Sequence, residues 1–162
     1  MTDPKDDLAP GYDVVIIGGG AVGMATAYYL RSLDTGCRIA VIERDSTYQF
    51  ASTPRASGGV RRLFALPENI LLSNFGIPIF ERFPELMAVD GEKLDIGFKK
   101  NGYLFIVPPE DVATLKRNYE LQRNMGVNVR FLEPAALKQR FPSMFVADLG
   151  GAVHSLDGSD QG

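Results

Sequence analysis

The alternation of apolar and polar positions changes several times along the chain, and each change marks an expected element. An apolar, β-branched run at 13–17 predicts a strand, 24–33 predicts a helix, and 39–42 predicts a second strand. Residues 21–30 are apolar nearly all round, which is typical of a helix buried against a sheet. Together these elements predict a βαβ unit with two parallel strands.

The pattern after residue 62 predicts a second group of elements. Alternation at 94–98, the turn signal at 101–102 and an apolar run at 103–107 predict a β-hairpin. A helix is expected over 67–87, kinked at Pro78, with a core-facing side formed by Ile70, Leu71, Phe75, Ile79 and Phe83. The remaining expected elements are a helix from 108 to 126, a strand over 127–131, a helix over 134–141 and a strand starting at 150–153.

The turn after the first strand carries glycines in a G-x-G-x-x-G pattern. Gly18 allows the tight turn, Gly20 lets a pyrophosphate approach the backbone, and Gly23 lets the helix pack closely on the sheet. The N–H groups at the helix start attract phosphates. Glu43 follows Gly23 by twenty residues, where its carboxylate can bind a ribose and repel a 2′-phosphate. The pattern predicts a dinucleotide site that disfavours NADP.

The stretch 45–62 has no strand or helix pattern and is long for a connection. It contains hydroxyls, glycines and the arginines Arg55, Arg61 and Arg62. Such a loop can bring N–H and O–H donors to a second part of a ligand. A mobile surface loop without a ligand is the alternative interpretation.

Composition narrows the class of protein. The chain has 162 residues, is 45% hydrophobic and 23% charged, and has a net charge of −3 without a basic run, which argues against nucleic-acid binding. One cysteine, Cys37, excludes an intrachain disulfide, and one histidine, His154, leaves no Cys/His metal site. No apolar run reaches the length of a membrane span, and residues 1–10 lack targeting features, so a cytoplasmic location is expected.

Both informative stretches resemble one family. They are similar to the N-terminus of FAD-dependent oxidoreductases of the D-amino-acid oxidase / sarcosine oxidase superfamily, and the likeness covers nearly the whole chain after residue 11. It is carried by 13–20, Gly23, Ala27, Leu30, 41–44, 51–53, 57–61, 66–69, Ser73, 102–104 and 157–158. The resemblance implies FAD as cofactor and a small-molecule amine or amino acid as substrate.

The resemblance implies roles for individual residues. Glu43 binds the ribose of FAD and Arg44 lies at its adenine end. Arg61 aligns with an arginine that pairs with the substrate carboxylate, although a surface or ion-paired arginine is an equally good interpretation. Arg55 stands near the histidine that links FAD covalently in some relatives, so no covalent link is expected there. Pyrophosphate binding is implied for Gly18, Gly20, Ala21, Val22 and Gly23, and contact with the phosphates and isoalloxazine for Ser52, Thr53, Ser57, Gly58 and Gly59.

The expected fold class is α/β. A Rossmann-like, FAD-binding βαβ unit is followed by part of a substrate domain with a mixed or antiparallel sheet. Two parallel strands are too few for a stable doubly wound sheet, so we expect the rest of a longer chain to complete the domain. The expected division is a flexible N-terminus (1–11), the first part of the FAD-binding domain (12–66), and a helix with the start of the substrate domain (67–162).

The resemblance implies oxidation of the C–N bond of an amino acid or N-methyl amino acid, with hydride transfer to flavin N5. No general base is visible, and His154 is interpreted as a strand or turn residue. An NAD-linked dehydrogenase is one alternative, but it requires a third parallel strand soon after Glu43. A non-catalytic flavoprotein that helps assemble a partner complex is another. This chain alone carries the ADP-binding half of the site, so weak or no FAD retention and no activity are expected of it.

Overall fold

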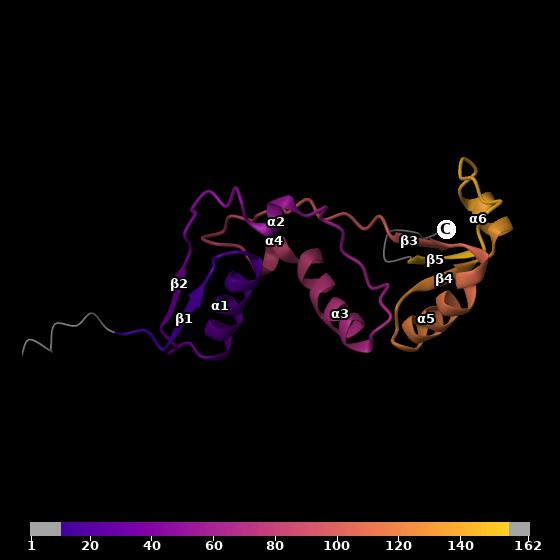
Figure 1. Cartoon of the computed structure of the whole chain (residues 1–162). Coiled ribbons are helices and arrows are strands. Elements are labelled where there is room, and N and C mark those ends of the chain that lie inside the picture. The colour runs from indigo at the N-terminus through magenta and orange to yellow at the C-terminus, as the bar shows by residue number, and fades with distance from the viewer. Residues whose placement is uncertain (1–10, 156–162) are drawn as a thin grey trace, which may run out of the picture. The chain divides into compact units, whose positions relative to one another are not determined.

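A computed structural model of the chain describes residues 11–155. The chain divides into two compact units, Met1–Gly59 (unit 1) and Val60–Gly162 (unit 2), and Figure 1 shows the helices and strands of each. Residues 1–10 and 156–162 lie outside the described part, so the expected flexible start and the family likeness at 157–158 stay predictions. The domain bounds expected at 12–66 and 67–162 also stay predictions.

Unit 1 contains the βαβ unit predicted from the sequence. The strands β1 (Val14–Ile17) and β2 (Ile39–Ile42) pair in parallel along all four residues, and α1 (Ala21–Leu33) connects them. The starts of the two strands are also tied together, because the Asp13 carboxylate accepts hydrogen bonds from the guanidinium and the backbone N–H of Arg38. The Rossmann-like interpretation of this segment is confirmed.

The expectation that α1 is buried is wrong. None of its residues is buried, and Val22 and Leu33 are 82% and 86% exposed. Among the described residues 11–59, Gly19 is the only buried one. A sheet of two four-residue strands is too narrow to cover a helix that is apolar nearly all round, so most of its apolar positions face solvent.

The stretch 45–62 contains one element that the sequence pattern did not reveal, the short helix α2 (Ser52–Arg55). Just before it, the Asp45 carboxylate accepts hydrogen bonds from the backbone N–H and the hydroxyl of Thr47, at 3.0 and 2.6 Å, which forms an Asx-type turn. A four-residue helix is too short to show helical periodicity. Within the part of the chain that the structure describes, β1 and β2 form a sheet of two strands, without the third parallel strand of an NAD-binding unit.

Unit 2 starts with the helical segment predicted over 67–87, but it consists of two helices. The first, α3 (Pro67–Glu81), continues through Pro78, and α4 (Phe83–Leu86) follows a break at Arg82. The break arises because Pro84 has no N–H and its ring clashes with the carbonyl group four residues earlier. The expected core face holds only in part, because Ile70 is buried whereas Leu71 and Phe75 are 59% and 62% exposed.

The predicted β-hairpin is wrong. The strand β3 (Tyr103–Val107) forms as expected, but residues 94–98 are not a strand. Instead, β3 pairs in antiparallel fashion with β5 (Gly151–Ser155), a partner far away in the sequence. The alternation at 94–98 was misleading because Gly97 has a φ of +64°, which interrupts an extended backbone.

The sheet of unit 2 has three antiparallel strands in the order β3-β5-β4, where β4 is Val129–Leu132. A 3-10 turn, η1 (Pro109–Asp111), and the helix α5 (Val112–Asn124) connect β3 to β4. The short helix α6 (Pro134–Arg140) follows β4. The helices and strands predicted from residue 108 onward are therefore confirmed, and so is the antiparallel character of this unit.

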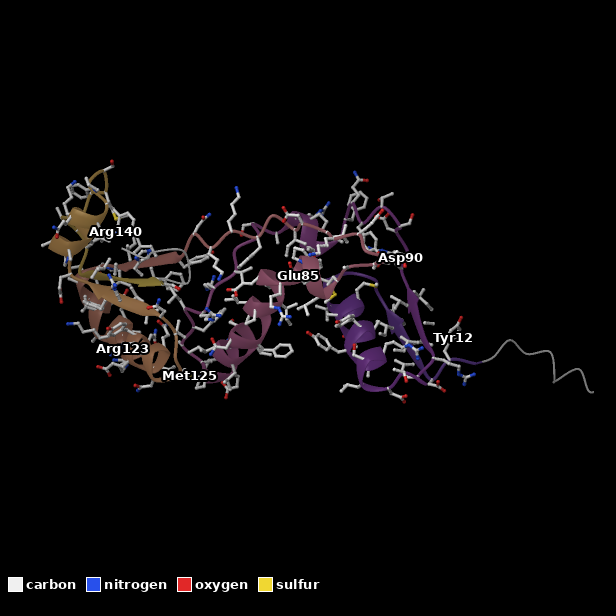
Figure 2. All side chains as sticks on the ribbon, turned by 180° about the vertical axis from the view of Figure 1, so that it is seen from behind. Tyr12, Glu85, Asp90, Arg123, Met125 and Arg140 are labelled. Atoms are coloured by element: carbon white, nitrogen blue, oxygen red, sulfur yellow. The ribbon has the colours of Figure 1, made fainter. Side chains whose placement is uncertain are left out.

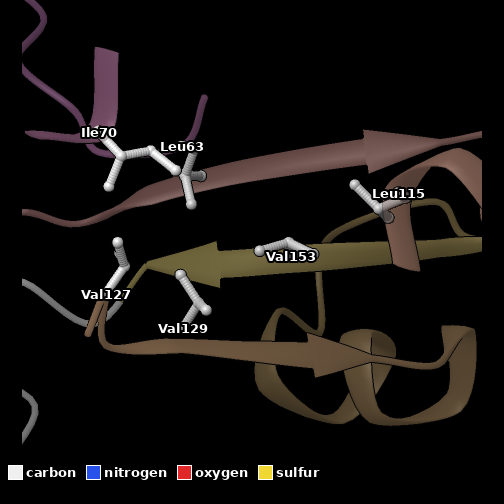
Figure 3. Packing of buried hydrophobic residues seen from close by; sticks show 6 residues of the cluster. All are labelled: Leu63, Ile70, Leu115, Val127, Val129 and Val153. Carbon is white, nitrogen blue, oxygen red and sulfur yellow. The ribbon is translucent and has the colours of Figure 1, made fainter. Parts of the chain in front are cut away.

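The hydrophobic core of unit 2 is built around β5. Val153, in the middle of this strand, is 1% exposed and belongs to a buried cluster whose members come from two helices, two strands and two connecting segments (Figure 3). Burying each such aliphatic side chain contributes about 1.5–3 kcal/mol. The cluster consists of Leu63, Ile70, Leu115, Val127, Val129 and Val153.

Candidate functional site

The turn from β1 into α1 has the geometry of a phosphate-binding turn. Gly18 has a φ of +101°, which favours glycine, and its N–H donates to the Ile42 carbonyl oxygen at 2.8 Å. Gly20 caps α1, yet no side chain caps the first turn of the helix and no acidic residue lies in it. The N–H groups at this helix start are therefore left for an anion.

Two glycines of the motif differ in what the surrounding protein atoms demand of them. A Cβ on Gly23 would overlap the carbonyl oxygen of Gly18, so only glycine lets α1 approach the turn this closely. A Cβ on Gly20 would meet no atom within 4 Å, and its φ of −67° suits any residue. The protein itself therefore does not require glycine at position 20. Its bare backbone leaves open the space in front of the helix, as a closely bound pyrophosphate requires.

The Glu43 carboxylate lies beside this turn and ties it to the end of β2. One oxygen accepts the N–H of Gly19 at 2.8 Å, and the other accepts the N–H of Asp45 at 2.9 Å. These two backbone N–H groups, that of Asp45 foremost, hold the pKa of the Glu43 carboxyl below its ordinary value. Each carboxylate oxygen has a second acceptor site, so Glu43 can also accept hydrogen bonds from the hydroxyls of a ribose.

A pocket of about 810 Å³ opens beside Glu43, lined by residues from 17–18, 42–45 and 47–51. Tyr48 and Phe50, which the sequence analysis did not single out, supply its aromatic surface. Tyr48 has a left-handed backbone, with a φ of +56°, and its hydroxyl oxygen would lie 2.9 Å from a Cβ on Gly19. Two aromatic residues shortly after the acid, in a stretch without strand periodicity, were the available signal.

The structure brings together some of the residues implied in cofactor binding and not others. Gly18, Glu43 and Arg44 line the same pocket. The other residues implied in cofactor binding form two groups, one in α1 and its N-cap and one in α2 and the segment after it. In the second group, Gly58 has a φ of +71°. In α1 and its cap these are Gly20, Ala21, Val22 and Gly23; in α2 and beyond they are Ser52, Thr53, Ser57, Gly58 and Gly59, none of which lines the pocket.

Arg61 lies in unit 2, where its guanidinium contacts aromatic rings. The guanidinium carbon is 4.8 Å from the centroid of the Phe64 ring, 5.4 Å from that of Phe105 and 5.8 Å from that of Tyr103. Among residues 11–155 no hydrogen bond or ion pair of Arg61 is found, so no carboxylate of this part of the chain neutralises its charge.

His154 lies on β5 with its ring packed against that of Phe141, at a centroid distance of 5.7 Å. Burial, and then the positive charges of Arg140 and Arg130, lower the pKa of His154. The imidazole is therefore neutral at neutral pH. Its placement within a strand agrees with the interpretation of His154 as a strand residue.

Neither a cluster of metal-binding side chains nor a membrane-spanning helix occurs in residues 11–155. Between residues 11 and 155, no three or more His, Cys, Asp or Glu side chains are grouped so that they could hold a metal ion. Over the same residues, no helix combines the length and the apolar character that crossing a bilayer requires.

Comparison with known proteins decides the family. The family described as FAD dependent oxidoreductase (DAO) matches residues 13–160. The chain belongs to this family. Members of the DAO family depend on FAD, so the cofactor that the resemblance implied is confirmed at the level of the family.

Individual relatives agree with this assignment. "FAD-dependent oxidoreductase domain-containing protein 1" from Bos taurus is 40% identical over 149 residues, which cover 90% of this chain and 31% of the relative. Mitochondrial sarcosine dehydrogenase from Mus musculus is 28% identical over 155 residues, covering 93% of this chain and 16% of that protein. The crystal structure of L-proline dehydrogenase from P. horikoshii superimposes with a TM-score of 0.69 at 27% identity, covering 93% and 38%. The chain thus spans about a third of the length of the bovine relative.

The geometry of unit 1 fits FAD. The uncapped start of α1 suits its pyrophosphate, the open space at Gly20 permits close approach, and Glu43 retains acceptor sites for its ribose. The NAD-linked alternative is set aside, since the family is FAD-dependent.

Proposed function

We propose that the whole protein is an FAD-dependent oxidoreductase that oxidises the C–N bond of an amino acid or N-methyl amino acid. The observation that carries the proposal is the pairing of the uncapped start of α1 with the Glu43 carboxylate, which hydrogen-bonds Gly19 in the same turn. The relatives named sarcosine dehydrogenase and L-proline dehydrogenase support the substrate class, because each name denotes an amino acid as the substrate.

The proposed role of this chain's own residues is to bind FAD and to orient it. Gly18 to Gly23 hold the pyrophosphate of FAD by backbone N–H groups, while Glu43 and Arg44 hold its adenosine end. Ser52, Thr53 and Ser57 to Gly59 approach the phosphates and the isoalloxazine. When bound, FAD supplies the hydride acceptor at flavin N5, so the protein need only supply position and electrostatics.

Arg61 is the residue of this chain proposed to act on the substrate. A guanidinium is a planar, permanently charged fork that pairs with a carboxylate through two parallel hydrogen bonds. Anchoring the carboxylate fixes the substrate carbon that loses hydride, and its amine must be neutral for the oxidation to proceed. We further propose that residues of a longer chain complete the half of the site around the flavin ring, and that the compartment is cytoplasmic.

The test is a spectroscopic titration of the full-length protein. We expect bound flavin in the purified protein and anaerobic bleaching of its visible absorbance by sarcosine, glycine or L-proline. Propionate, which resembles these substrates but has no amine, is the matched control and leaves the flavin oxidised. Bound flavin that no amine bleaches would overturn the enzymatic proposal and favour the non-catalytic flavoprotein that assembles a partner complex.

A further inference from the structure

Three aromatic rings surround the guanidinium of Arg61, and they come from two segments of unit 2. Tyr103 and Phe105 alternate along β3 and so share one face of the sheet. Their rings meet edge to face, with centroids 6.0 Å apart and planes at 84°. Phe64 follows Arg61 by three positions, before α3 begins.

The three rings are held from behind by the core. Phe64, Tyr103 and Phe105 all pack against the buried cluster around Val153. The Phe64 backbone is also fixed, because the side chain of Gln122, itself only 4% exposed, donates a hydrogen bond to the Phe64 carbonyl oxygen at 3.1 Å. Rings packed against a close-packed core have few alternative rotamers. The surface on which the guanidinium lies is therefore rigid.

The guanidinium has two unequal edges. Its Nε atom is buried and makes no hydrogen bond, whereas neither terminal nitrogen is among the buried unpaired atoms. Within residues 11–155 no acceptor is bonded to these terminal nitrogens. Aromatic faces attract the positive charge without using any N–H donor, which leaves the donors of the terminal nitrogens for a ligand.

We propose that Phe64, Tyr103 and Phe105 are positioning residues that present only the two terminal nitrogens of Arg61 to a ligand carboxylate. The carboxylate then binds end-on, with one oxygen on each terminal nitrogen, and cannot use the buried Nε edge. This inference rests on the proposed function, in which the ligand is the carboxylate of an amino-acid substrate. Lysine cannot replace Arg61, because an ammonium group has no fork to hold two oxygens.

The experiment follows chemical modification of Arg61 in the full-length protein. Phenylglyoxal adds to the terminal nitrogens of arginine, and mass spectrometry of the Arg61 peptide gives the modification rate. Acetate is the carboxylate probe, and acetamide is its uncharged control. We expect acetate to slow the modification of Arg61 about fivefold to tenfold, as a charge-assisted bidentate contact predicts, and acetamide to leave the rate unchanged.

Variants then separate the rings from the arginine. The double variant Tyr103→Leu/Phe105→Leu should reduce the acetate effect to less than about twofold, since the guanidinium loses two of its three rings. Tyr103→Phe keeps a ring and should retain the wild-type effect. Circular dichroism checks folding, and if the double variant does not fold, the single Tyr103→Leu variant gives the same comparison with a smaller loss.

The matched control uses another arginine of unit 2. Arg123, on α5 (Figure 2), lies over the single ring of Tyr119 at 5.5 Å and donates to its hydroxyl. Acetate should not slow its modification, and Tyr119→Leu should leave the protection of Arg61 intact. Equal protection of Arg61 in the wild type and the folded leucine variants would overturn the positioning role, and so would no protection in the wild type.

The protection of Arg61 by acetate is measured without enzymatic turnover, so it tests the positioning role separately from the proposed oxidation. If acetate protects Arg61 through the rings but no amino acid bleaches the flavin, the site stands and the proposed oxidation fails. If amino acids bleach the flavin and acetate does not protect Arg61, the oxidation stands and the positioning role fails.

Discussion

Unit 1 and unit 2 differ in what their residues contribute. Unit 1 carries the glycine motif and the Glu43 contacts, yet Gly19 is the only buried residue among its described positions. Unit 2 carries no motif of comparable specificity, yet it contains a cluster of six buried aliphatic residues. A dinucleotide is bound by a few backbone donors, whereas a fold is stabilised by buried apolar area. A strong motif therefore identifies a ligand without showing what stabilises the segment that carries it.

The largest expected effect concerns cofactor retention by this chain without further residues. Under the proposed function, unit 1 offers the ADP-binding side alone, so FAD should be lost during gel filtration of the 162-residue chain and retained by the full-length protein. The measurement is flavin absorbance of the protein peak. Stoichiometric flavin on the short chain would show that unit 1 binds the cofactor unaided.

The next largest effect is a difference in stability loss between a truncated side chain in unit 2 and one in unit 1. Ile70→Ala in unit 2 empties a site that is 0% exposed and should cost about 2–5 kcal/mol in the free energy of unfolding. The control Leu33→Ala in unit 1 changes a side chain that is 86% exposed and should cost less than about 0.5 kcal/mol. Urea unfolding followed by circular dichroism suits a chain that contains no Trp. Similar losses in both variants would contradict the comparison.

A third effect distinguishes two glycines within unit 1. Gly23→Ala places a Cβ onto the Gly18 carbonyl oxygen. This variant should lose about 1–3 kcal/mol of stability and should also bind less FAD. Gly20→Ala meets no protein atom within 4 Å, so it should cost at most about 1 kcal/mol as a poorer helix cap while also reducing FAD content. FAD content and melting temperature of the full-length variants are measured together. Full FAD content in Gly20→Ala would argue against a pyrophosphate at this turn.

The smallest expected effect is a pH dependence. Since the folded pKa of Glu43 is lowered, the stability contributed by its carboxylate is complete above the ordinary Glu pKa of about 4.3. That contribution is lost as pH falls through the lowered folded value. Glu43→Gln should therefore weaken the acid dependence of unit 1, measured by hydrogen exchange of the Gly19 amide, whereas Glu68→Gln, whose carboxyl lies outside this contact, should not. An unchanged acid dependence in Glu43→Gln would exclude the proposed role of its hydrogen bonds.

The parts of the fold that the sequence predicted are those set by local chemistry. The βαβ unit follows from two short β-branched runs and a glycine turn, and the overlap at Gly23 shows why that position needs glycine. The strand and helix order after residue 108 likewise follows from periodicity and from prolines at helix starts. Each of these signals lies within a window of a few residues.

The parts that the sequence did not predict depend on distant partners. Residues 94–98 alternate like a strand, but Gly97 interrupts them and β5 takes the place beside β3. The contacts of Arg61 with Tyr103 and Phe105 could not be predicted, because these residues lie about forty positions further along the chain. The apolar character of α1 was clear, but its exposure was not, because exposure depends on how much of the helix the sheet covers.

The bare apolar surface of α1 has a practical consequence. Its exposed side includes Val22, Tyr29 and Leu33, which line a shallow apolar hollow along the helix. Surfaces of this kind promote association between molecules, and salts that are excluded from protein surfaces strengthen the attraction. Colloidal behaviour of the 162-residue chain should therefore depend strongly on sulfate, and solubility tags or charged substitutions along this helix are the natural remedy for its handling in solution.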